Sequence, residues 1–206
     1  MKKVTGKMEN SETNGLNHGH RKIEEGVPMS ARMRKQGDRD LSHRSITGVL
    51  SYALAWLLVV IGTDISRQQP LFVYTIGLLL LLIGLLRLLM VKFYDNWYGK
   101  SPGLWRRWFG LGMISSAALW SFFAAWVLSR VGLTTEGLII LLPLIMICAG
   151  GVTSLAPNQL FFQVFFGVIL LPQIIVLITY KTAHAYLIAV MLFLFGIFIF
   201  ITAKSI

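Results

Sequence analysis

The sequence predicts an all-α fold, that of a polytopic membrane protein built as a six-helix transmembrane bundle. Of the 206 residues, 55% are hydrophobic and only 14% are charged, whereas a soluble domain carries nearer about 25% charged residues. The mean hydropathy is +0.68. Six long apolar runs hold most of the hydrophobic residues, and Arg87 alone of the 19 basic and 9 acidic residues falls inside them. This composition excludes an ordinary soluble globule and a secreted disulfide scaffold.

The six runs have the length of membrane-spanning helices. A helix that crosses about 30 Å of hydrocarbon needs about 20 mostly apolar residues. The predicted spans cover approximately 46–63, 71–91, 108–128, 138–156, 160–180 and 186–203. Strands are disfavoured because the runs are apolar on all sides rather than at every second residue. We therefore expect residues 46–206 to form one helical membrane domain.

The segments outside the spans are too short for a further folded domain, since chains below about 40 residues seldom fold unaided. The tail 1–45 is rich in Gly, Asn, Ser, Lys and Glu and lacks aromatic residues, which predicts a disordered basic tail. No apolar core follows its first lysines, so a cleavable signal peptide is not expected. Met29 and Met33 leave open a later start of translation.

The distribution of basic residues predicts the orientation of the spans. An even number of spans places both termini on one side. That side carries fifteen Lys and Arg residues, in the tail, in segment 92–107 and at Lys204. The opposite side carries three: Arg67, Arg130 and Lys181. The positive-inside rule therefore predicts cytoplasmic termini. The net charge of +10 then lies next to anionic lipid headgroups, and no nucleic-acid partner is expected.

The segment 92–107, KFYDNWYGKSPGLWRR, alternates aromatic and basic residues. Such a pattern can stack nucleobases. At the boundary of a span it is more typical of an interfacial aromatic belt. We therefore expect this segment to lie along the membrane surface as a loop.

Three long polar side chains fall inside the predicted spans: Arg87, Gln163 and Gln173. A central arginine costs about 2.5–3.5 kcal/mol on insertion scales. Because Arg87 lies four residues from the cytoplasmic end of its span, we expect its side chain to snorkel to the headgroups. The alternative is a pairing with Asp95 or with a ligand carboxylate. The two glutamines are candidates to face a small cavity.

The spans contain no Asp, Glu or His. This absence disfavours proton-coupled transport, transmembrane haem and an intramembrane metalloprotease, all of which need such groups. Serine residues occur, but no His or Lys lies within the spans to activate one. The single cysteine, Cys148, lies in an apolar run. We predict no catalytic residue, no metal site and no cofactor, and the chain is not expected to be an enzyme.

Small residues recur every four positions in the third span, at Ala117, Ser121 and Ala125. A helix of about 3.6 residues per turn places them on one stripe. Such stripes let helix backbones approach closely inside a membrane. This stripe is therefore a candidate packing surface.

The fourth and fifth spans combine glycine, polar and proline residues. The candidate packing or hinge positions are Gly150, Gly151, Ser154, Pro157 and Pro172. A proline inside a helix frees a carbonyl group that local polar groups must satisfy. Two interpretations stay open: kinked packing within the bundle, or a glycine-rich pair of helices that lines a small cavity or moves as a hinge.

The last half of the chain resembles a known membrane region. It has the WRRWF entry to the third span, Trp120, the AGGVTSLAP end of the fourth span, the LLP before Gln173, and an aromatic sixth span that runs to Lys204. From about Trp105 onward it is similar to the six-transmembrane N-terminal sensor region of bacterial sensory histidine kinases and diguanylate cyclases. The first two spans match that region by topology alone.

The resemblance implies a sensory and dimerisation module of the bacterial inner membrane. Its partners would be the lipid bilayer, a second copy in a homodimer, and a cytoplasmic kinase or cyclase output domain. In the similar proteins the sixth span continues into that output domain, whereas this sequence ends at Ile206. The resemblance supplies no ligand-binding residue. Two alternatives stay open: a small transporter or channel, and a membrane assembly protein.

Overall fold

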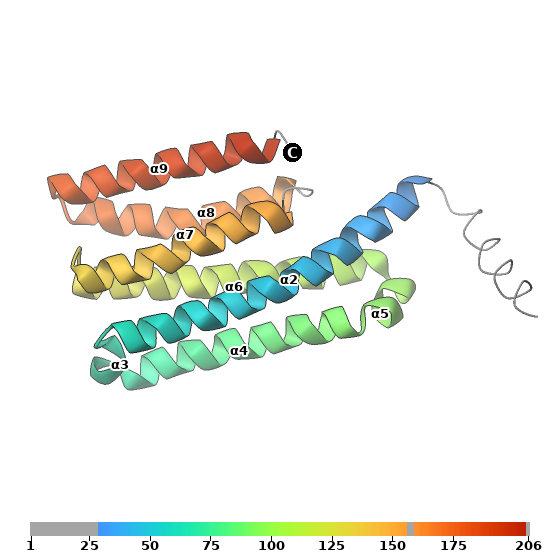
Figure 1. Ribbon diagram of the computed structural model, residues 1–206, viewed down its shortest axis with the longest axis horizontal. Helices are drawn as coiled ribbons and strands as arrows, with labels where there is room; N and C mark the ends of the chain where they lie inside the picture. The colour runs from blue at the N-terminus through green and yellow to red at the C-terminus, as the bar shows by residue number, and fades with distance from the viewer. Residues whose placement is uncertain (1–28, 156–158, 205–206) are drawn as a thin grey trace, which may run out of the picture. The chain divides into compact units, whose positions relative to one another are not determined.

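The computed structural model describes residues 29–155 and 159–204, and within these ranges it contains helices and no strand. In chain order the helices are α2 (Met29–Gly62), α3 (Ile65–Gln68), α4 (Pro70–Lys92), α5 (Tyr94–Lys100), α6 (Pro102–Val131), α7 (Thr135–Leu155), α8 (Gln159–Thr179) and α9 (Ala183–Lys204) (Figure 1). The all-α fold that the sequence predicts is confirmed.

The chain divides into two compact units, Met1–Asp38 and Arg39–Ile206. Six helices are long and apolar enough to cross a membrane, over Lys35–Gly62, Pro70–Lys92, Pro102–Val131, Thr135–Val152, Leu160–Thr179 and Ala183–Thr202. Each of these stretches overlaps one of the predicted spans. The chain is therefore a multi-pass helical membrane protein.

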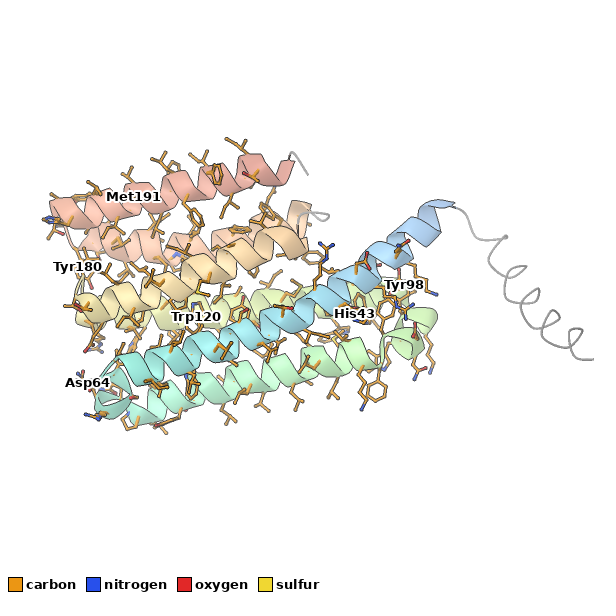
Figure 2. All side chains as sticks on the ribbon, in the orientation of Figure 1. His43, Asp64, Tyr98, Trp120, Tyr180 and Met191 are labelled. Carbon is orange, nitrogen blue, oxygen red and sulfur yellow. The ribbon has the colours of Figure 1, made fainter. Side chains whose placement is uncertain are left out.

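Consecutive spans are joined alternately at two ends of the unit Arg39–Ile206. Figure 2 shows Asp64 and Tyr180 at one end and Tyr98 at the other. We call these the α3 end and the α5 end, after the short helices that lie there. Each span therefore runs antiparallel to the span before it in the sequence.

Helix α2 begins earlier than the hydropathy pattern predicts. It starts at Met29, inside the tail 1–45 that the sequence predicts to be disordered. The segment before the apolar run contains Met, Ala, Arg, Lys and Gln, which have high intrinsic helix propensity. The helix of the first span therefore continues outward through charged residues. Residues 1–28 lie outside the described part of the chain.

The segment 92–107, predicted as a surface loop, is mostly helical. Helix α5 occupies its centre, and α6 begins at Pro102, whose missing N–H costs nothing in a first helical turn. The rings of Tyr94 and Tyr98 stack with centroids 4.8 Å apart and meet the ring of Trp105, which is 1% exposed. These three side chains belong to the core. An interfacial belt requires exposed aromatic residues, and those in and next to this segment are Phe93, Trp97 and Trp108.

Helices α6 and α8 form the centre of the packing, and their mutual contact is the most extensive between any two helices of the described residues. Helix α6 also packs against α4, α5 and α7. In the most apolar 18-residue stretch of α6, 56% of the residues are buried, whereas the same stretch of α9 has 22% of its residues buried. Helix α9 lies at the edge, beside α8 (Figure 1).

Candidate functional site

The charged residue inside the spans, Arg87 of α4, points into the bundle. Its side chain is 3% exposed, and its Cζ atom lies 5.9 Å from the ring centroid of Phe109 on α6. The prediction that this side chain snorkels to the headgroups is therefore wrong. The alternative of a pairing with Asp95 is not among the described contacts, and Asp95 itself is exposed on α5.

Glycines of two other helices lie beside the arginine, and one of them, Gly112, is in tight contact with it. A Cβ atom on Gly112 of α6 would lie 3.0 Å from Cγ of Arg87. A Cβ atom on Gly48 of α2 would lie 3.8 Å from its Nη2 atom. The alkyl stem therefore lies directly against the backbone of α6. This contact explains why the side chain runs inward rather than outward.

The guanidinium group of Arg87 lines a cavity of about 200 Å³. Helix α2 contributes most of the polar lining, through Arg44, Thr47, Ser51 and Tyr52. Helices α6, α7 and α8 contribute apolar side chains and glycine backbone. No Asp or Glu is found among the lining residues of the described ranges. The cavity is therefore positively charged.

The polar lining changes from exposed to buried along the cavity. Arg44 and Thr47 are exposed, whereas Tyr52 is 6% exposed and Arg87 is 3% exposed. The Ser51 hydroxyl donates to the carbonyl of Thr47 at 2.9 Å. The Tyr52 hydroxyl is fully covered and has no hydrogen-bond partner among the described residues. A buried hydroxyl without a partner costs about 1–3 kcal/mol, so this group requires an explanation.

Both glycines of the fourth span belong to this cavity. Gly150 and Gly151 lie on α7 and contribute to its wall. A Cβ atom on Gly151 would lie 2.5 Å from Cε1 of Phe165, whereas a Cβ atom on Gly150 would meet nothing within 4 Å. Gly151 therefore allows α7 and α8 to approach, and Gly150 borders the open volume. The interpretation of the fourth and fifth spans as a pair that lines a cavity or moves as a hinge stays a prediction.

The small-residue stripe of the third span is buried, and its middle residue, Ser121, lies at the contact between α6 and α8. Ala117, Ser121 and Ala125 are all buried, with exposures of 0%, 1% and 9%. The Ser121 hydroxyl donates to the carbonyl of Ile169 on α8 at 3.1 Å. Such a bond requires a close approach of the two backbones, as small residues permit. We call this contact the α6–α8 seam.

Gln173 and Pro172 complete the polar part of the seam. The Gln173 Nε2 atom donates to the carbonyl of Ser121 at 2.9 Å and to its hydroxyl at 3.2 Å. The carbonyl of Ile169, which accepts from Ser121, is next in the chain to that of Val168, the residue four positions before Pro172 whose carbonyl loses its helical N–H partner. The seam thus supplies polar partners for a proline-containing helix, and α8 remains continuous through Pro172.

The remaining candidates are placed elsewhere. Gln163 is exposed on the outside of α8, while Gln173 is 0% exposed. The expectation that both glutamines face one cavity is therefore wrong, and neither lines the cavity at Arg87. The side chain of Ser154 and all of Pro157 lie outside the described residues.

Sequence reasoning missed Tyr52, Ser51 and Arg44 as neighbours of Arg87. They lie on another helix, and hydropathy carries no information on which faces of two helices meet. The signal available was the pair Gly48 and Gly112, because glycine inside a span marks close approach of another group. Among the described residues, no group of three or more His, Cys, Asp and Glu side chains could hold a metal ion. The absence of metal, cofactor and catalytic residues stays a prediction.

Six apolar helices, five of which line a positively charged cavity, define the class of this chain as a multi-pass membrane protein with a polar site inside the bundle. No protein-family model, curated protein or solved structure matches the chain. The resemblance to bacterial sensor regions therefore rests on the residues quoted above.

Proposed function

We propose that the chain is a sensory and dimerisation module of a bacterial signal-transduction protein, embedded in the inner membrane with both termini cytoplasmic. In this proposal it forms a homodimer and relays a signal through α9 to a cytoplasmic kinase or cyclase output domain. The resemblance of the last half of the chain supports it, and the excess of basic residues in the sequence segments assigned to the side of both termini supports the orientation.

The observation that carries the proposal is the position of α9. Its inner face packs on α8 through buried residues such as Ala185, Ala189 and Leu192. Its other face exposes large apolar side chains: Met191, Leu194, Phe198 and Ile201, with exposures of 57–65%. Figure 2 shows Met191 on this helix. A helix held by one neighbour can shift or rotate at less cost than one packed on all sides, as a relay between two packing states requires.

The dimer part of the proposal is tested by cysteine cross-linking in membranes. In a Cys148→Ala background, Leu194→Cys and Phe198→Cys place a thiol on the outer face of α9, and Ala189→Cys and Leu192→Cys place one on the inner face as matched controls. Oxidation is expected to give covalent dimers for the outer positions alone. Absence of cross-links at the outer positions, or equal cross-linking at all four, contradicts a dimer through α9.

The relay part is tested with a chimera in which a diguanylate cyclase output domain follows Lys204. Insertion of one to four alanines at the junction rotates the output by about 100° for each residue. A relay through α9 predicts product formation that rises and falls with helical periodicity. An output insensitive to these insertions contradicts the relay, and solute flux in vesicles would then indicate the transporter alternative.

A further inference from the structure

We propose that the cavity at Arg87 is a binding site for a phosphate group. The inference concerns the cavity alone and does not depend on the relay through α9. The ligand chemistry is common to two sources, the headgroup of an anionic phospholipid and a free phosphate ion or small phosphate ester.

The charges on the cavity wall point to an anion. Two cationic residues, Arg44 and Arg87, line the cavity, and no carboxylate is found among the described lining residues. Arg87 is 3% exposed, so its charge is weakly screened by solvent. A ligand of opposite charge lowers the energetic cost of placing two cations at one apolar-walled volume, and a neutral or cationic ligand does not.

The donors of the wall fit a phosphate in particular. Guanidinium groups bind phosphate oxygens through paired N–H donors, and the two arginines come from different helices, α2 and α4. Tyr52 lines the same cavity, and its hydroxyl is buried and has no partner among the described residues. A phosphate oxygen gives that hydroxyl an acceptor. A tetrahedral group with several oxygens can engage donors from separate helices at once, whereas a planar carboxylate offers two oxygens in one plane.

The volume and position of the cavity are consistent with such a group. Its volume of about 200 Å³ is several times the share of one water molecule in the liquid, about 30 Å³. The exposed residues Arg44 and Thr47 form the outer lining, at the start of the apolar run of α2, where headgroups meet hydrocarbon. Arg87 and Tyr52 form the buried lining.

The binding experiment uses the full chain purified in dodecyl maltoside, a detergent without phosphate. One arm titrates inorganic phosphate, with sodium chloride and sodium acetate at matched ionic strength, and follows the heat of binding. The other adds phosphatidylglycerol and counts bound lipids by native mass spectrometry. Saturable binding of one phosphate ion supports a free-phosphate site, and retention of one lipid that competes with phosphate supports a headgroup site.

Two variants and one control connect the binding to the cavity. Arg87→Lys keeps the charge but removes the paired donors, and Tyr52→Phe removes only the hydroxyl. Both are expected to weaken binding, by at least tenfold for Arg87→Lys and by several-fold for Tyr52→Phe. Arg130→Gln removes an exposed cation at the end of α6 and is expected to leave binding unchanged. The helix content of Arg87→Lys is checked before binding is measured. If Arg87→Lys does not fold, Tyr52→Phe provides the test.

Three results overturn the inference. They are the absence of binding in both arms, binding that Tyr52→Phe and Arg87→Lys leave unchanged, and acetate binding as tight as phosphate binding. Because the readout is binding to the isolated chain, failure here leaves the chimera experiment on α9 untouched. Failure of that experiment likewise leaves the phosphate site standing.

Discussion

The α6–α8 seam and the Arg87 cavity place polar groups inside the same apolar bundle in opposite ways. At the seam, Ser121 and Gln173 are neutral, and their donors reach backbone or hydroxyl oxygens across the two helices within 3.2 Å. At the cavity, Arg87 and Tyr52 are buried beside a volume of about 200 Å³. Polar groups whose partners lie within the protein hold helices together. Arg87 and Tyr52, by contrast, lie at a cavity that can admit a ligand.

The largest expected effect comes from placing a bulky side chain in the seam. Ser121→Leu removes two interhelical hydrogen bonds and forces α6 and α8 apart, and overpacking of a tight contact costs about 1–3 kcal/mol before the lost bonds are counted. We expect the free energy of unfolding to fall by about 3 kcal/mol, measured by reversible unfolding in mixed micelles with SDS.

Ser115→Leu is the matched control for that change. Ser115 lies on the same helix but is exposed, so the same substitution there adds apolar surface to a side that faces outward. We expect little change in stability. Equal loss in both variants would show that the seam is not tightly packed.

The second effect compares neighbouring glycines of α7. Gly151→Ala places a methyl group 2.5 Å from the buried ring of Phe165, which must move, and we expect a loss of about 1–2 kcal/mol. Gly150→Ala meets nothing within 4 Å and gains helix propensity of up to about 1 kcal/mol. Unfolding of the two variants side by side measures the difference, and a reversed order would contradict the contact between α7 and α8.

The spans were predictable from the sequence because hydropathy reports directly on the cost of transfer into hydrocarbon. Helix ends were less predictable. The charged turns of α2 after Met29 and the first turns of α6 after Pro102 continue a helix beyond its apolar run, and hydropathy does not register them. The segment around Tyr94 looked like a loop because its contacts with Trp105 are tertiary.

The site residues likewise divide into those that the sequence predicts and those that it does not. The four-residue spacing of Ala117, Ser121 and Ala125 predicted a packing stripe, because spacing along one helix determines which residues share a face. The direction of Arg87 was not predictable, since it depends on Gly112 of another helix, α6. Periodicity within one helix carries no information about its neighbours.

A smaller effect separates the two glutamines of α8. Gln173→Leu leaves the backbone and hydroxyl of Ser121 without their donor, and hydrogen bonds between membrane helices contribute about 0.6–2 kcal/mol. Gln163→Leu changes an exposed position on the same helix and is expected to be neutral or slightly stabilising in a membrane. Thermal unfolding of both variants tests the role of Gln173 in the seam. A larger loss of stability in Gln163→Leu than in Gln173→Leu would contradict that role.

The smallest effect lies at the α3 end, where the chain leaves the spans. The Tyr180 hydroxyl donates to the carbonyl of Leu128 and so joins the ends of α8 and α6. Tyr180→Phe removes this bond, and we expect a loss of about 0.5–1.5 kcal/mol. Tyr186→Phe, at a residue 45% exposed, is the matched control and is expected to be neutral.

The same contact makes a prediction about pH. Burial raises the pKa of Tyr180 above its ordinary value of 10, and this effect outweighs a hydrogen bond with the backbone of Gly132 that lowers it. The folded chain therefore retains the phenol proton at a pH where the unfolded chain has lost it. The stabilisation is complete below pH 10 and declines as the pH rises through the folded pKa. Because phenylalanine has no proton to lose, the stability difference between wild type and Tyr180→Phe is expected to shrink above pH 10, and a constant difference would contradict the raised pKa of Tyr180.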